Sequence, residues 1–213
     1  MTDNFCNKFL ATNGWAPFDV PDTLLNNLNN AIDSIDFDST EIINPNAMNA
    51  TYVYDLNMSS VMQCKEFNLI HKKYIATVFF SGLKFTKAFY VYDSCSTINR
   101  NQSWHFDSLP KFKIILGLSG IDSDSSTKFL NGSHKSIYSL LNSLLLRVTK
   151  GRLRIAKYGC KNLPFFAKLC KQFLIGNNFQ PSRSIVFNTN CIHSAGMPIN
   201  GIRQVLILHF ESR

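Results

Sequence analysis

His105 and Asp107 are two side chains of metal-binding type with a single residue between them. If the alternating segment 103–107 forms a β-strand, both side chains point to the same face and can reach one metal ion. A third such side chain, His193, follows the predicted strand 184–187. Two histidines and one carboxylate form the facial triad that holds non-haem iron(II) and leaves positions open for a bidentate cosubstrate and O2. We therefore predict that His105, Asp107 and His193 bind iron(II), although a His-x-Asp pair alone is common and depends on its context.

Arg203 belongs to that context, because it opens the apolar segment 203–210 ten residues after His193. A buried strand rarely begins with an unpaired arginine. Residues 125–210 contain no Asp or Glu, which makes the carboxylate of a bound ligand an attractive partner. A guanidinium binds a carboxylate through two parallel hydrogen bonds, which suits the distal end of 2-oxoglutarate. Arg203 is thus predicted to bind this cosubstrate, and a structural ion pair is the alternative.

Several motifs in roughly the last half of the chain, taken together, resemble the phytanoyl-CoA dioxygenase family of iron(II)/2-oxoglutarate oxygenases. They are Trp104-His-Phe-Asp107, Lys113-Ile-Ile-Leu-Gly-Leu-Ser-Gly-Ile-Asp122, Phe129-Leu-Asn-Gly-Ser-His-Lys135 and His193-Ser-Ala-Gly with Arg203. The opening Asn13-Gly14-Trp15 is also similar to the start of that family. Two positions depart from its pattern: Ser125-Ser126-Thr127 stands where a Gly and a small apolar residue are frequent, and Asn131 where a Pro is usual.

The resemblance implies a mainly β protein with flanking helices, built as a double-stranded β-helix (jelly-roll, cupin-like) with the metal at one mouth. It implies metal ligation by His105, Asp107 and His193, cosubstrate binding by Arg203, and Fe(II), 2-oxoglutarate and O2 as cofactors. We expect a single domain over 1–213. It would have a helical support part at about 1–85 and a barrel core at about 86–213, with a basic helical insertion at about 136–180.

The periodicity of apolar residues predicts the elements that must position these side chains. Residues 38–63 give only a weak signal for short strands and loops. The clearer predictions are helices at 21–36, at 137–148 and from Pro164, and strands at 88–93, 112–118, 184–187 and 203–210.

Charge is divided unevenly along the chain, whose net charge is +8. Residues 1–124 hold 9 Lys and Arg against 13 Asp and Glu, whereas residues 125–210 hold 12 and none. The cations of the second part must therefore face solvent, anionic ligands or the acidic first part. The basic run 147–171 either recognises a phosphate or carboxylate on the substrate or forms a solvated helix face.

Six cysteines include no Cys-x-x-Cys pair, and the N-terminus lacks the pattern of a signal peptide. No apolar run reaches membrane-spanning length. We expect a cytoplasmic protein with reduced cysteines and no membrane span.

Other polar side chains receive less specific interpretations. His134 is expected to be a turn residue, and His209 a core histidine on the strand that Arg203 opens. Tyr90 and Tyr92 could line the cosubstrate pocket, but packing is favoured. Lys111 and Lys113 suit either an anion or a solvated strand end.

These features predict a dioxygenase that hydroxylates a small anionic metabolite, or a carrier- or nucleotide-linked biosynthetic intermediate. Asp107 favours hydroxylation over halogenation, and desaturation or cyclisation stays open. The alternative is a nucleic-acid-directed oxygenase or a basic nucleic-acid-binding module, supported by the charge of 125–210. The aromatic residues fall at core spacing, which disfavours nucleic acid as a partner. An inactive scaffold is a third hypothesis, against which the complete triad argues. The sequence does not predict the oligomeric state.

Overall fold

A computed structural model provides the structure of the chain. It describes residues 3–43, 51–76, 83–95, 107, 112–122, 125–129, 131–135, 144, 148, 183–194, 196, 198 and 201–212.

Two antiparallel sheets form the framework of the described residues. The larger has seven strands in the order β1-β7-β5-β9-β4-β3-β2, and the smaller pairs β6 with β8. The strands of the larger sheet are β1 (Trp15–Pro17), β2 (Phe37–Ile43), β3 (Thr51–Leu56), β4 (Leu83–Cys95), β5 (Phe112–Ser119), β7 (Ser184–Asn188) and β9 (Gly201–Ser212). Those of the smaller sheet are β6 (Lys128–Phe129) and β8 (His193–Ser194).

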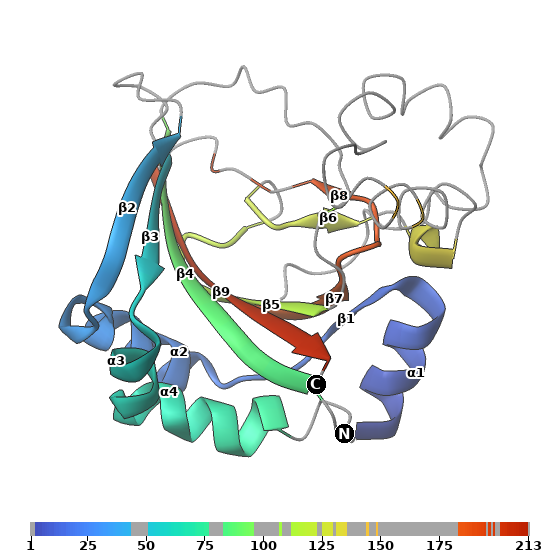
Figure 1. The fold of residues 1–213 in the computed structure, drawn as a ribbon, viewed down its shortest axis with the longest axis horizontal. Helices are drawn as coiled ribbons and strands as arrows, with labels where there is room; N and C mark the ends of the chain where they lie inside the picture. Colours follow the sequence, from blue (N-terminus) through green and yellow to red (C-terminus); the bar gives the residue numbers. More distant parts are fainter. Residues whose placement is uncertain are drawn as a thin grey trace.

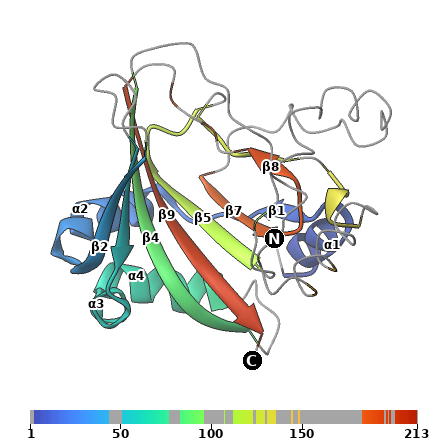
Figure 2. The same cartoon turned by 45° about the horizontal axis from the view of Figure 1, so that its top comes forward.

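Helices cover one face of the large sheet, and the small sheet lies against the other (Figures 1 and 2). Beneath the sheet in Figure 1 lie α2, α3 and α4, while α1 lies beside the β1 edge. The helical elements are α1 (Asp3–Asn13), α2 (Asp22–Ala31), η1 (Ile32–Ser34), α3 (Met58–Gln63), α4 (Lys65–Ile70), the π-helix η2 (His71–Ile75) and the short η3 (Ser133–Lys135).

The alternation of side chains along β9 separates two cores. Leu206, Leu208 and Phe210 pack toward the helices in the larger apolar cluster. Val205 belongs to a second cluster on the opposite face. Because residues two apart on a strand share a face, Arg203 lies on the same side as Val205, facing the small sheet. The strand therefore carries a buried arginine into a largely apolar interior.

Most predicted elements that fall on described residues are present. The helix predicted at 21–36 is α2 followed by η1, and the predicted strands at 88–93, 112–118, 184–187 and 203–210 lie within β4, β5, β7 and β9. The weakly patterned segment 38–63 contains most of β2 together with β3 and α3, so the first 85 residues supply three sheet strands besides helices. The helix predicted at 137–148 is described only at Leu144 and Val148, which are helical and exposed. The strand at 103–107 and the helix from Pro164 lie outside the described residues, apart from Asp107.

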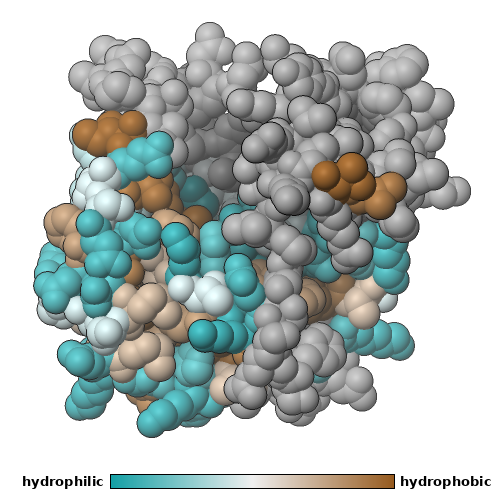
Figure 3. All heavy atoms as spheres, viewed as in Figure 1, coloured by the Kyte–Doolittle hydropathy of each residue, from teal (hydrophilic) through white to brown (hydrophobic). Residues whose placement is uncertain are grey.

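The surface of the described residues is mixed in character. Figure 3 shows hydrophilic side chains spread over this part, with apolar ones between them. Exposed large apolar residues include Phe37, Ile42, Met62 and Leu69. Among the described helices, none has the length and apolar character to cross a membrane. Cys191 and Cys64, the cysteines whose side chains are described, are both free thiols, and burial raises the pKa of Cys191 to about 12.

Candidate active site

Two of the predicted metal ligands meet in the structure. The Nε2 atom of His193 lies 3.3 Å from Oδ2 of Asp107, although the two residues come from distant parts of the chain. The same carboxylate oxygen lies 2.9 Å from Nζ of Lys113 on β5. Asp107 and Lys113 are largely buried, and His193 is 5% exposed. A carboxylate oxygen and an imidazole nitrogen thus converge on one place beside a cation.

A tight connection between β7 and β8 delivers His193 to this place. Asn188 accepts two hydrogen bonds in it, one on its side chain from the Asn190 N–H at 2.9 Å and one on its carbonyl from the Cys191 N–H at 2.8 Å. Such side-chain contacts are how asparagine stabilises turns. The carbonyl of Thr189 accepts from the backbone N–H of Asp107 at 3.1 Å. One turn therefore positions both candidate ligands.

The orientation of the His193 ring is set by its other nitrogen. Nδ1 lies 2.9 Å from the carbonyl oxygen of Cys191, and a carbonyl can only accept a hydrogen bond. Nδ1 therefore carries a proton, which directs Nε2 toward Asp107. A metal-binding histidine is typically anchored in this way. The ring also packs on Phe187, with centroids 4.8 Å apart, and lies near Phe129 at 6.1 Å.

The electrostatics at Asp107 favour its charged form. Burial alone would raise its pKa, but the hydrogen bond and charge of His193, together with the Lys113 ammonium, hold the pKa well below its usual range. The side chain is thus a carboxylate at neutral pH. A permanent carboxylate beside an imidazole with a directed Nε2 is a donor pair that suits a divalent transition metal.

The third predicted ligand, His105, lies outside the described residues. Within the residues that the structure describes, no group of three potential metal ligands is found. Of the three predicted ligands, the structure therefore describes Asp107 and His193, and the metal site stays a prediction.

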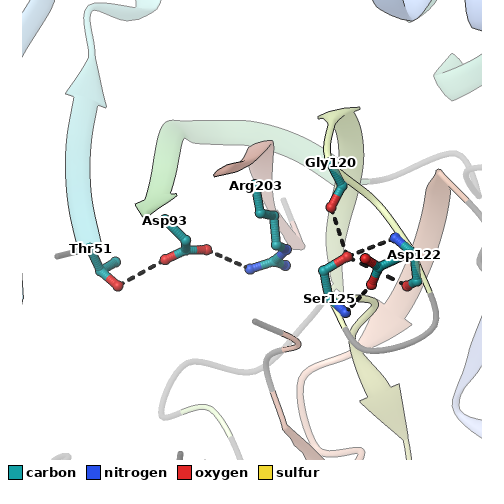
Figure 4. Close-up of polar contacts among 6 residues, drawn as sticks. All are labelled: Thr51, Asp93, Gly120, Asp122, Ser125 and Arg203. Carbon is teal, nitrogen blue, oxygen red and sulfur yellow. Dashed lines mark hydrogen bonds and ion pairs between the residues drawn. The ribbon is translucent and has the colours of Figure 1, made fainter. Parts of the chain in front are cut away.

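Arg203 is buried on the face of the large sheet that also carries Lys113. It has a partner from the acidic first part of the chain. Its Nη1 donates to Oδ2 of Asp93 at 2.7 Å, and the two side chains are 5% and 2% exposed. Oδ1 of Asp93 in turn accepts from Oγ1 of Thr51 at 2.8 Å. Figure 4 shows Asp93 between the two, with one carboxylate oxygen toward each. The three residues are register partners on β3, β4 and β9.

The Gly120–Ser125 turn lies against the backbone of Arg203 (Figure 4). Gly120 has a φ of +65°, and a Cβ there would come within 1.8 Å of the Ile202 carbonyl oxygen. The buried Ser125 closes the turn, because its Oγ donates to the Gly120 carbonyl and accepts from the Asp122 N–H, both at 2.7 Å. Ser125, which departs from the family pattern, is therefore held by hydrogen bonds to Gly120 and Asp122.

The Asn131 departure has a comparable explanation. Its Oδ1 accepts from Nε1 of Trp15, and the Gly132 N–H donates to the carbonyl of Asn13 at 2.8 Å. His134 lies in the η3 turn, as predicted, with its Nε2 3.3 Å from the Ala11 carbonyl. The motif near the start of the chain and the motif at 129–135 are thus fastened to each other. Trp15 stacks on Phe129 with centroids 5.1 Å apart, which supports the aromatic layer under His193.

Side chains with less specific predictions are also placed. Tyr90 packs with the helix-side core and accepts a hydrogen bond from Gln204, which confirms the packing interpretation. His209 is half-buried and packs against Phe89, with centroids 4.9 Å apart. Burial, with help from the charge of Lys113, lowers its pKa to about 4. Lys113 contacts a buried carboxylate, so it is not a solvated strand end.

Sequence reasoning missed Asp93, which ends the predicted strand 88–93. Alternation places Asp93 on the same face as the buried Val91, and a carboxylate on a buried face signals a buried partner. The sequence therefore indicates that Asp93 has a buried partner, but it does not identify that partner as Arg203. Only the pairing of β4 with β9 does so.

The basic second part of the chain meets the acidic first part at two arginines, which is one of the three alternatives that its charge pattern left open. Both of its described arginines do so: Arg203 pairs with Asp93, and Arg183 with Asp22 at 2.9 Å. The basic run 147–171 lies outside the described residues, apart from Val148.

No protein-family model and no curated protein matches this sequence. Solved structures do match it. HygX from Streptomyces hygroscopicus, with nickel and 2-oxoglutarate bound, is 13% identical over 98% of this chain and 86% of its own, with a TM-score of 0.59. SnoK, a non-haem α-ketoglutarate-dependent carbocyclase from nogalamycin biosynthesis, is 10% identical over 99% and 86%, with a TM-score of 0.63. SnoN, an epimerase in complex with Fe3+, α-ketoglutarate and nogalamycin RO, is 9% identical over 99% and 83%, with a TM-score of 0.62.

The chain has the double-stranded β-helix fold. In this double-stranded β-helix the strands β7-β5-β9-β4 face the β6-β8 pair (Figure 2). His193 comes from the small sheet, while Lys113 and Arg203 come from the large one. The candidate site therefore lies between the two sheets.

Proposed function

We propose that this protein is an iron(II)- and 2-oxoglutarate-dependent oxygenase. In this proposal His105, Asp107 and His193 hold the metal, and Arg203 binds the distal carboxylate of 2-oxoglutarate. The observation that carries it is the convergence of Asp107 and His193, with the other ring nitrogen of His193 anchored to a carbonyl. The double-stranded β-helix of this chain is shared with proteins whose structures contain 2-oxoglutarate and a metal.

The described residues fit such a metal, which would supply the activation of O2 when bound. Asp107 contributes a permanent carboxylate and His193 a directed Nε2, and both are held by one turn. The ammonium of Lys113 contacts Oδ2 of Asp107, the same oxygen that would bind the metal. Phe187 and Phe129 form an apolar floor under His193 that excludes water from this side of the site.

Arg203 is suited to orient the cosubstrate because it lies on the same inner face, is buried, and keeps donors unused. A guanidinium can fix a carboxylate bidentately. We propose O2 and 2-oxoglutarate as the reactants that accompany the organic substrate. By its motifs, the phytanoyl-CoA dioxygenase family is the proposed affiliation.

The substrate we propose is a small biosynthetic intermediate that carries a phosphate or carboxylate, recognised by the basic run 147–171. SnoK and SnoN belong to nogalamycin biosynthesis or contain a nogalamycin compound, which supports the biosynthetic part of this proposal. We propose hydroxylation as the reaction, because Asp107 keeps the carboxylate that a halogenating site would lack. The carbocyclase and epimerase chemistries of those two proteins make product analysis part of any substrate screen.

The test is an anaerobic titration of the purified protein with iron(II) and 2-oxoglutarate, followed by the visible metal-to-ligand charge-transfer band of the complex. Wild type is compared with His105→Ala, His193→Ala and Arg203→Ala, and with His71→Ala as a control histidine that packs on Phe67. We expect the band in wild type and in the control, and no band without His105 or His193. Arg203→Ala should need far more 2-oxoglutarate. A wild type that binds iron without forming the band contradicts the cosubstrate, and one that binds no iron favours an inactive scaffold.

A further inference from the structure

The two described arginines of the basic part use their guanidinium groups very differently. In Arg183 all three nitrogens donate: Nε to the Gly117 carbonyl at 3.0 Å, Nη1 to Asp22 at 2.9 Å, and Nη2 to Asn26 at 3.1 Å. A further bond from Nη2 reaches the Leu118 carbonyl. Such complete use of donors is what a purely structural arginine requires, since unpaired buried donors are destabilising.

Arg203 engages one nitrogen only. Its Nη1 donates to Asp93, and its Nε is buried without a hydrogen-bond partner. Nη2 forms no hydrogen bond with a described residue either. The unused atoms, Nε and Nη2, form one edge of the guanidinium, and this edge is the one that can bind a carboxylate bidentately. The more deeply buried arginine of the two thus keeps the larger unused donor set.

Asp93 is itself held at both oxygens. Thr51 donates to Oδ1 at 2.8 Å, while Arg203 donates to Oδ2 at 2.7 Å. The carboxylate cannot rotate without losing one of these bonds. Because the three residues are cross-strand neighbours on β3, β4 and β9, the sheet fixes their order. The contact at Nη1 therefore sets the direction of the whole guanidinium.

We propose that Asp93, braced by Thr51, is a positioning residue that ties Arg203 through Nη1 and presents its Nε–Nη2 edge to the distal carboxylate of 2-oxoglutarate. This inference rests on the proposed function and deepens it. It assigns a role to Asp93 and Thr51, which lie on strands that precede every candidate ligand in the chain.

The energetics of burial support a second anion at this place. Burial lowers the pKa of Arg203, and Asp93 only partly offsets this. One carboxylate therefore does not compensate fully for the desolvation of the guanidinium. A ligand carboxylate on the open edge would supply the missing charge and the missing hydrogen-bond acceptors.

The opposite role for Asp93 makes a different prediction. If Asp93 occupied the ligand's place, its carboxylate would compete with 2-oxoglutarate, and its removal would tighten cosubstrate binding. The bond to Nη1 alone argues against competition, because it leaves the bidentate edge open.

The experiment is isothermal titration calorimetry of the nickel(II)-loaded protein with two ligands. One is 2-oxoglutarate, and the other is 2-oxopentanoate, which has the same chain but lacks the distal carboxylate. The variants are Asp93→Ala, Asp93→Asn, Thr51→Val and Thr51→Ser. Asp22→Asn is the matched control, since it removes the carboxylate that pairs with Arg183 instead.

We expect Asp93→Ala to weaken 2-oxoglutarate binding by about tenfold or more and to leave 2-oxopentanoate binding unchanged. Asp93→Asn keeps an oxygen for Nη1, so it should stay within about threefold of wild type, as should Thr51→Ser. The 2-oxoglutarate affinity of Thr51→Val should lie between those of these two variants and that of Asp93→Ala. Asp22→Asn should bind both ligands with the affinity of wild type.

Two results overturn the positioning role. Asp93→Ala could bind 2-oxoglutarate as tightly as wild type or more tightly, or it could lose affinity for both ligands alike. If Asp93→Ala does not fold, equal 2-oxoglutarate affinities of Thr51→Val and Thr51→Ser overturn it. A wild type that does not distinguish the two ligands overturns the proposed function and this inference together. A discriminating wild type with unaltered variants overturns the positioning role alone.

Discussion

At the Asp107 end of the site, one carboxylate oxygen faces two nitrogens, from Lys113 and His193. At the Arg203 end, one guanidinium nitrogen faces one oxygen of Asp93, and other donors stay unused. In the first arrangement the ammonium of Lys113 already lies at the carboxylate oxygen, so a metal would compete with it there. The second has more donors than its carboxylate can use, so an incoming anion finds free ones. The difference predicts that the two ends respond to separate ligands.

The sharpest way to break this comparison is to remove one charge from each end. Asp107→Ala should weaken nickel(II) or iron(II) binding by roughly 100-fold or more, because a ligand is lost outright. Arg203→Met should leave metal binding within about threefold and weaken 2-oxoglutarate binding by roughly 100-fold. Calorimetry with metal alone, and then with 2-oxoglutarate on the metal-loaded protein, separates the two. Loss of metal binding in Arg203→Met would show that the ends are not independent.

A backbone change beside Arg203 should have the next largest effect. In Gly120→Ala the added Cβ would meet the Ile202 carbonyl at 1.8 Å, at a φ of +65°. We expect a loss of about 2–4 kcal/mol in the free energy of unfolding, from clash and strain together. Gly201→Ala is the control, since its φ is +89° but nothing lies within 4 Å of its Cβ. Gly201→Ala should lower the free energy of unfolding by only about 1–2 kcal/mol, because the left-handed backbone there is unfavourable for alanine. Urea unfolding of both variants tests this, and equal losses would contradict it.

Lys113→Met sharpens the comparison at the Asp107 end. The ammonium and a metal would share Oδ2 of Asp107, so its removal should raise metal affinity by about tenfold. Competition titration against a metal chelator measures the change. Lys87→Met is the control, because Lys87 pairs with Asp55 at 3.8 Å and is mostly exposed. Weaker metal binding in Lys113→Met would instead show that Lys113 holds Asp107 in place for the metal.

The smallest expected effect is a pH dependence at His209. Burial, with the charge of Lys113, lowers its pKa to about 4, so folding favours the neutral ring. The protein should therefore lose stability as the pH falls from the unfolded-state value of 6.5 toward 4. The loss should be on the order of 1 kcal/mol after allowance for solvent screening. His209→Phe should lose less over this range in urea titrations at pH 7 and 4.5. Parallel losses in variant and wild type would assign the pH dependence to other groups.

The sequence singles out candidate site residues but does not predict which side chains they contact. His193 and Arg203 are recognisable because a polar residue at the start or end of an apolar strand is unusual. The strands themselves follow from their apolar patterns, as for β5 and β9. The partners depend on which strands are neighbours and in what register. Alternation puts Asp93 on a buried face, but only the β4–β9 pairing brings it to Arg203.

The same limit applies at the metal end. Lys113 is six residues from Asp107 in the sequence. That spacing alone does not show whether the Lys113 ammonium pairs with Asp107 or faces solvent. The weak pattern of 38–63 likewise hid β2 and β3, because β2 is an exposed edge strand and its neighbour β3 is mostly half-buried. The charge imbalance allowed solvent, anionic ligands or the acidic first part as partners for the cations of the second part, and Arg183 with Asp22 is a case of the last.

The line from Thr51 through Asp93 to Arg203 crosses the three neighbouring strands β3, β4 and β9. The proposed 2-oxoglutarate site therefore depends on a strand that precedes β4 in the chain. A chimera that joins the residues from β4 onward to another protein's N-terminal segment would keep the candidate ligands and lose the brace on Asp93. Through these contacts, binding of 2-oxoglutarate at Arg203 should slow amide hydrogen exchange along β3 relative to the ligand-free protein.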